Sequence, residues 1–286
     1  MQKPSEYAFD GIGTKWTISS LLPLSDILST RVQQLVEDFD KTYSRFRDDS
    51  YITMISRSPG TYGFSEAGSR LLDFYYDLYR QTDGLVTPLI SRMLEQLGYD
   101  SSYSFKQSPV AAIEPWENVM SWEKPNLTTL QSTLLDFGAA GKGLLVDELV
   151  ALLHADGVES FVVDGSGDMR QSGAIPNYVG LEHPLDNSMV IGAIDVKDSS
   201  LCASASNRRR WHGLHHIVNP ATQSPENNII ATWVIAPSAM IADGLATALF
   251  FVEPEKLQSA YSFQYVRMFH SQRIDSSKNF SGELFV

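Results

Sequence analysis

One stretch near the middle of the chain, residues 134–147, most constrains what the chain can fold into. It reads LLDFGAAGKGLLVD, in which one acid lies among apolar residues and a run of small residues follows. Small side chains let a backbone turn sharply and approach another group closely. We therefore predict a strand over 133–137, a tight turn and a helix over 143–155. The free N–H groups at the start of such a helix, with Lys142 beside them, suit an anionic ligand such as phosphate. The alternative is a strand-to-helix turn that binds no ligand.

The remainder of the chain mixes strands with separate helices. Apolar residues at helical spacing predict helices over 22–46, 71–79 and 239–251. Alternating or short apolar runs predict strands over 9–19, 161–163, 178–181, 189–196 and 229–236. Residues 85–90 are expected to be extended because of Pro88, and residues 100–132 to be a loop with short strands. This order favours an α+β fold with mixed or antiparallel sheets and packed helices over a doubly wound sheet.

Composition and charge exclude several classes of protein. The 286 residues carry a net charge of −12, which argues against a general nucleic-acid binder. The compact basic run at residues 208–210 is interpreted as a solvated turn. A single cysteine, Cys202, rules out an internal disulfide and a cysteine-rich metal site. No apolar run is long enough for a membrane span, and residues 1–6 lack an apolar signal core. We expect a cytoplasmic protein, with a removed leader as the alternative.

A pair of hard oxygen ligands is predicted on the last long helix. Asp243 and Thr247 are four residues apart, so both side chains lie on one helix face, among alanines and a glycine. A carboxylate with a hydroxyl suits magnesium, which completes its shell with phosphate oxygens and water. The alternative is a helix-packing face whose acid serves as a cap.

Two consecutive histidines form a second candidate. His215 and His216 lie in an apparently extended segment before Val218, so at most one of them faces a given site. One of them has the pKa range of a general base. Neither has a carboxylate at helical spacing, so the pair is a weak zinc site. The small-residue stretch matches neither the P-loop nor the dinucleotide-binding glycine pattern.

The ordered set of these segments resembles the ApbE family of FAD:protein FMN transferases, once described as thiamine-biosynthesis lipoproteins. The resemblance covers residues 10–255. Its segments are DFGAAGKG at 136–143, VD at 146–147, GD at 167–168, HIVNP at 216–220 and APSAMIADGLATA at 236–248, with SRF at 44–46 and DG at 83–84 before them. The resemblance implies a T-fold-related ApbE architecture. We expect one catalytic domain over 1–286, or two α+β lobes with the active site between them.

The resemblance also implies an activity and a set of site residues. The activity is magnesium-dependent transfer of FMN from FAD to a threonine hydroxyl of a target flavoprotein, with release of AMP. Asp243, Thr247 and the backbone carbonyl of Ala139 would bind Mg²⁺, and His216 and Asp243 would be catalytic. The residues that would line the FAD site are Ile12, Phe46, Leu85, Val86, Thr87, Asp136, Lys142 and Val218. Two alternatives are a carrier that binds FAD without transfer, and a magnesium-dependent FAD pyrophosphatase.

Overall fold

A central antiparallel sheet of eight strands organises the chain, which is described over residues 3–285 by a computed structural model. The strand order is β1-β2-β6-β7-β10-β15-β16-β17, and every neighbouring pair is antiparallel. The strands are β1 (Ser5–Gly11), β2 (Thr14–Ser20), β6 (Phe161–Asp164), β7 (Met169–Ser172), β10 (Ser200–Ala205), β15 (Ile229–Ala236), β16 (Gln264–Phe269) and β17 (Ile274–Ser276). The predicted α+β class with antiparallel sheets is confirmed.

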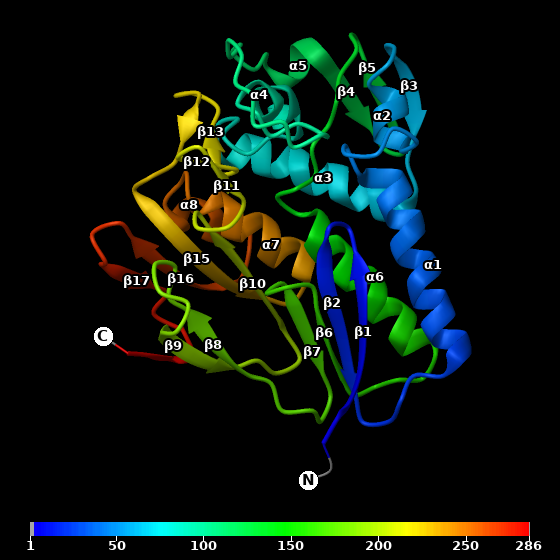
Figure 1. Ribbon diagram of the computed structural model, residues 1–286, viewed down its shortest axis with the longest axis vertical. Coiled ribbons are helices and arrows are strands. Elements are labelled where there is room, and N and C mark those ends of the chain that lie inside the picture. Colours follow the sequence, from blue (N-terminus) through cyan, green and yellow to red (C-terminus); the bar gives the residue numbers. More distant parts are fainter. Residues whose placement is uncertain (1–2, 286) are drawn as a thin grey trace.

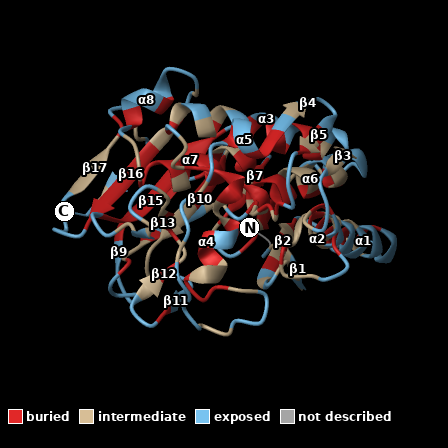
Figure 2. Ribbon diagram, turned by 90° about the horizontal axis from the view of Figure 1, so that it is seen from above, coloured by how far each residue is buried: buried red, intermediate tan, exposed pale blue. Residues whose placement is uncertain are grey.

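Two buried helices lie against this sheet (Figure 1). They are α6 (Gly141–Ala155) and α7 (Ala239–Ala248), which pack on one another and on strands of the sheet. Their other side is covered by α1 (Asp26–Tyr43) and α3 (Glu66–Gln81). Leu144, Leu145 and Leu149 of α6 are fully buried, as expected for a helix between two layers (Figure 2).

Smaller elements surround this core. Above α3 in Figure 1 lies a group of α2 (Tyr51–Ile55), β3 (Gly60–Gly63), η1 (Pro88–Ile90), α4 (Ser91–Gln96), α5 (Trp116–Val119), β4 (Met120–Glu123) and β5 (Asn126–Thr129). A three-stranded sheet contains β8 (Tyr178–Glu182), β9 (Val190–Asp195) and β18 (Glu283–Leu284). Short pairs are formed by β11 (Arg210–Trp211), β12 (Leu214–His215), β13 (Val218–Asn219) and β14 (Ser224–Pro225), and α8 (Pro254–Gln258) precedes β16. Among residues 3–285, no helix has both the length and the apolar character needed to cross a membrane.

Three segments have a secondary structure that differs from the predicted one. Residues 9–19 make two strands, because Ile12 and Gly13 have φ of +41° and +74° and form a hairpin turn. Residues 85–90 are not extended throughout, because Pro88 takes the first position of a helical turn that Thr87 caps. The predicted strand over 133–137 is irregular backbone that joins no sheet; the Asp136 N–H donates to the carbonyl of Pro88 instead. By contrast, β15 has the predicted bounds of 229–236, and the helix after it begins at 239 as predicted.

The contact between α6 and α7 depends on a glycine and an acid of α6. A Cβ at Gly143 would lie 2.2 Å from the carbonyl oxygen of Ala239, so only glycine fits this crossing. One turn later, the Asp147 carboxylate accepts hydrogen bonds from the Ser238 hydroxyl and from the N–H groups of Ala239 and Met240. Asp147 therefore caps the start of α7 and fixes its position along α6.

Replacing Gly143 by alanine is expected to lower the free energy of unfolding by about 3 kcal/mol, because the added methyl overlaps backbone that cannot yield easily. Gly141→Ala is the matched control in the same helix, since a Cβ there meets only Phe137, at 3.7 Å. Its effect should stay within about 1 kcal/mol. Denaturant unfolding of both variants checks this, and equal stability of the two would contradict the account of the crossing.

Candidate functional site

A cavity of about 820 Å³ opens beside the start of α6 and the face of α7 that carries Asp243 and Thr247. Its walls come from both the N-terminal and the C-terminal halves of the chain. All of the site residues named from the sequence line it, although their individual roles stay predictions: Ile12, Phe46, Leu85, Val86, Thr87, Asp136, Ala139, Lys142, His216, Val218, Asp243 and Thr247. Segments that are distant in sequence therefore meet in one concave site of the size that holds a small-molecule ligand.

Asp243 is buried at the contact between the two central helices. It is 3% exposed, and its Oδ2 atom accepts a hydrogen bond of 2.9 Å from the N–H of Gly143. Burial, and then the charge of Asp168, raise the pKa of Asp243 well above its usual value. A carboxyl group in such a place stays ionised only when positive charge lies beside it. Thr247 follows one turn later, and its hydroxyl lies 3.4 Å from that of Ser204.

The turn before α6 leaves the carbonyl of Ala139 without a hydrogen-bond donor among the described residues. The Gly143 N–H, which would reach back to this carbonyl in a regular helix, donates to Asp243 instead. No hydrogen bond to the Ala139 carbonyl occurs within residues 3–285. The other side of the turn is fixed, because the Ala139 N–H donates to the hydroxyl of the buried Tyr75 at 3.0 Å. Ala139, Asp243 and Thr247 all line the cavity.

These three oxygens fit a magnesium ion better than a transition metal. In the described part of the chain, no three or more His, Cys, Asp or Glu side chains group in a way that could hold a metal. A zinc site needs such a group. Magnesium is often held by one or two carboxylates, with water and substrate phosphate in the remaining positions. One carboxylate, one hydroxyl and one free carbonyl are therefore a compatible donor set.

Lys142 forms an ion pair that the sequence did not reveal. Its Nζ contacts Oδ2 of Asp168, which is fully buried and whose Oδ1 accepts from the N–H of Ala203 at 3.2 Å. Burial alone would lower the pKa of Lys142, but the charges of Asp168 and Asp243 outweigh it and the pKa is raised. Lys142 is therefore a protonated cation already neutralised by a partner. The only sequence signal for Asp168 was its place in the GD segment.

Asp136 has a partner that was also missed, Arg45. The Nε of Arg45 donates to Oδ2 of Asp136 at 2.5 Å, and Nη2 donates to the carbonyl of Tyr99 at 3.1 Å. The guanidinium lies 4.1 Å from the ring centroid of Phe46, on which the ring of Tyr103 stacks at 5.6 Å. These parallel rings give the cavity one flat aromatic wall, which suits a planar ligand.

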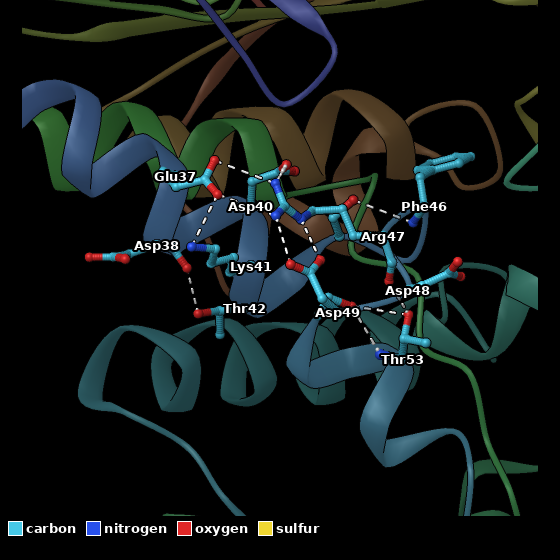
Figure 3. Close-up of polar contacts among 12 residues, drawn as sticks. Glu37, Asp38, Asp40, Lys41, Thr42, Phe46, Arg47, Asp48, Asp49 and Thr53 are labelled. Atoms are coloured by element: carbon cyan, nitrogen blue, oxygen red, sulfur yellow. Dashed lines mark hydrogen bonds and ion pairs between the residues drawn. The ribbon is translucent and has the colours of Figure 1, made fainter.

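A charged network supports the turn that carries Arg45 and Phe46. Arg47 pairs with Glu37 and Asp40 of α1, at 3.2 and 3.0 Å, and with Asp49 at 2.9 Å (Figure 3). Each surface ion pair alone contributes little to stability. One guanidinium that links three carboxylates, however, fixes the segment that follows α1. The network thereby orients the aromatic wall.

His216 faces the cavity, whereas its neighbour does not. His216 lines the cavity, while His215 is 3% exposed and pairs with Arg210 between β11 and β12. The buried Nδ1 of His216 has no hydrogen-bond partner within residues 3–285. Burial, and then the charges of Arg209 and His215, lower the pKa of His216 to about 3. The imidazole is therefore neutral near pH 7, and burial together with the two nearby charges disfavours its protonation.

Comparisons with known proteins agree on one family. The sequence model of the ApbE family matches residues 12–268. The chain is similar to FAD:protein FMN transferase of Escherichia coli K12, with 24% identity over 86% of this chain and 77% of that protein. A shorter match, to FAD:protein FMN transferase of Treponema pallidum, has 31% identity over 43% of this chain and 39% of that protein.

Solved structures share the fold. The flavin transferase ApbE from Vibrio cholerae superposes with a TM-score of 0.82 at 20% identity, covering 98% of each chain. An ApbE protein from Thermotoga maritima gives a TM-score of 0.83 at 20% identity, covering 97% of this chain and 98% of that one.

His216 gives a pH prediction. Its pKa is about 3 in the folded chain and near the ordinary value of ~6.5 in the unfolded chain, so its neutral form stabilises the fold above pH ~6.5. That contribution is lost as the pH falls toward 3. Imidazole NMR signals assigned with His216→Gln should show no titration of His216 between pH 5 and 8, whereas the urea-unfolded control titrates. A midpoint near pH 6.5 in the folded protein would contradict this environment.

Proposed function

The chain belongs to the ApbE family, and from that premise we propose that it transfers FMN from FAD to a threonine hydroxyl of a target flavoprotein. The observation that carries the proposal is the single cavity in which all the residues implied by the resemblance meet. The cavity takes residues from Ile12 to Phe251, which supports one catalytic domain over the chain. Its volume of about 820 Å³ and its flat aromatic wall suit a large planar cofactor.

The proposed reaction breaks a diphosphate and forms a phosphoester. The threonine oxygen attacks the phosphorus of the FMN half, the bond from that phosphorus to the bridging oxygen breaks, and AMP leaves with the bridging oxygen. Such transfers depend on positioning and charge neutralisation more than on covalent help from the protein. Asp243, Thr247 and the Ala139 carbonyl would hold Mg²⁺, which when bound neutralises phosphate oxygens.

The remaining roles in the proposed reaction belong to side chains of the protein. His216 is the proposed acceptor of the threonine proton, because its Nδ1 is unpartnered within the described residues and the anionic diphosphate beside it would raise its pKa from about 3. General-base help of this kind contributes about 10²–10⁴-fold in rate. Lys142, whose charge is balanced by Asp168, lowers the pKa of Asp243 and so favours its ionised form. The aromatic wall at Phe46 and Tyr103 would orient a planar ring of the substrate.

The activity is tested with purified protein, FAD, magnesium and a flavoprotein domain that carries an accessible threonine. We expect a fluorescent acceptor band on a denaturing gel, loss of that band when the threonine is replaced by alanine, and AMP in the supernatant. FMN and AMP released without an acceptor would instead support the pyrophosphatase. FAD binding with neither product nor band would support the carrier.

The metal donors are tested by two substitutions on α7. Asp243→Asn keeps an oxygen for the Gly143 N–H but removes the charge, so kcat/KM for transfer should fall by at least about 100-fold. Thr247→Val should raise the magnesium concentration needed for half-maximal activity by about tenfold, while Thr247→Ser, which keeps the hydroxyl, should not. Full activity of Asp243→Asn would remove the metal assignment.

A further inference from the structure

The basic run at residues 208–210 is exposed, as predicted for a solvated turn, and two of its residues also line the cavity. It follows β10, and Arg208 and Arg209 line the cavity, whereas Arg210 belongs to β11 and does not. The run was interpreted from the sequence as solvated, and the proposed chemistry has so far given it no role. Its position beside a site for a diphosphate raises the question of which of these cations is available to a ligand.

Most charged side chains of the cavity wall already neutralise one another. Asp136 pairs with Arg45, Asp168 with Lys142, Glu182 with Arg208, and Asp40 with Arg47. Within residues 3–285, two charged residues of the wall have no oppositely charged side chain within 4 Å. These are Asp243 and Arg209, one anion and one cation. Arg209 also makes no hydrogen bond within that part of the chain.

The charge of Arg209 acts on the centre of the site. It lowers the pKa of His216, second only to burial, and it also lowers the pKa of Asp243 and of Lys142. Arg209 lines the same cavity as these three residues. The Arg209 backbone has φ of +44°, an uncommon conformation for a residue other than glycine.

We propose that Arg209 binds the diphosphate of the dinucleotide substrate in the cavity that it lines together with Asp243. This inference rests on the proposed function for the identity of the ligand. A guanidinium donates two parallel hydrogen bonds to phosphate oxygens, a geometry that lysine cannot reproduce. In this position Arg209 contacts the substrate and stabilises the charge that develops on the departing AMP phosphate, which makes it a catalytic residue.

The test compares FAD affinity in wild type, Arg209→Gln and Arg209→Lys by flavin fluorescence, in buffer with EDTA so that no metal contributes. Arg210→Gln is the matched control, because it removes a neighbouring exposed charge outside the cavity. We expect Arg209→Gln to bind FAD at least tenfold more weakly at low salt, Arg209→Lys to recover part of the loss, and Arg210→Gln to match wild type within twofold.

Salt dependence separates a phosphate contact from a merely structural role. The affinity of wild type should fall with NaCl more steeply than that of Arg209→Gln, so that the two converge at high salt. Parallel salt curves, or affinities of the two within threefold at low salt, would overturn the assignment.

The outcomes also separate this inference from the proposed transfer. A fluorescent acceptor band from wild type, together with unchanged FAD binding in Arg209→Gln, would refute the inference alone. Selective, salt-dependent loss of FAD binding in Arg209→Gln without any acceptor band would refute the transfer alone. Equal melting temperatures of the variants and wild type are expected, because the Arg209 side chain is exposed.

Discussion

The hydrogen bond from the Gly143 N–H to the Asp243 carboxylate connects the two helices on which the site depends. It forms because glycine lets the backbones of α6 and α7 meet, and because Asp147, one turn along, caps α7 and sets its position. The same bond removes the donor that would otherwise occupy the Ala139 carbonyl. A single core contact therefore positions one proposed metal donor and frees another. Burial of this kind raises the pKa of Asp243, so its charged form requires a nearby cation.

Charge pairing in the cavity follows from the cost of burying ions. An isolated charge in a desolvated wall is expensive, and Lys142–Asp168 and Arg45–Asp136 avoid that cost by pairing. Asp243 lacks such a partner in the described part of the chain and lies beside two neutral oxygens. Arg209 also has no anionic partner within residues 3–285, but its side chain is exposed and solvated. A substrate with two phosphates and its magnesium ion would supply the missing charges of both signs. The wall is thus complementary to a metal–diphosphate unit as a whole.

The bounds of some helices and strands could be predicted from the sequence, whereas ion pairs between residues far apart in the sequence could not. The bounds of β15 and the start of α7 follow from an apolar run that ends at Pro237 and the capping residue Ser238, which are short-range signals. Residues 133–137 have the composition of a strand, yet they join no sheet, and the Asp136 N–H donates to the carbonyl of Pro88 instead. Arg45 lies 91 residues before Asp136, and no periodicity encodes such a pairing. The twelve site residues were named because an ordered set of motifs resembles a family, and the fold brings them to one cavity.

The central claim is that Asp243, Thr247 and the Ala139 carbonyl hold the cation that meets the substrate diphosphate. The most direct measurement is anomalous diffraction from crystals soaked with Mn²⁺ and FAD, since manganese takes hard oxygen ligands as magnesium does. We expect one anomalous peak at about 2.0–2.5 Å from these three oxygens, with the diphosphate beside it. Ordered FAD in the cavity with no peak there, or with the metal bound by other residues, would contradict it.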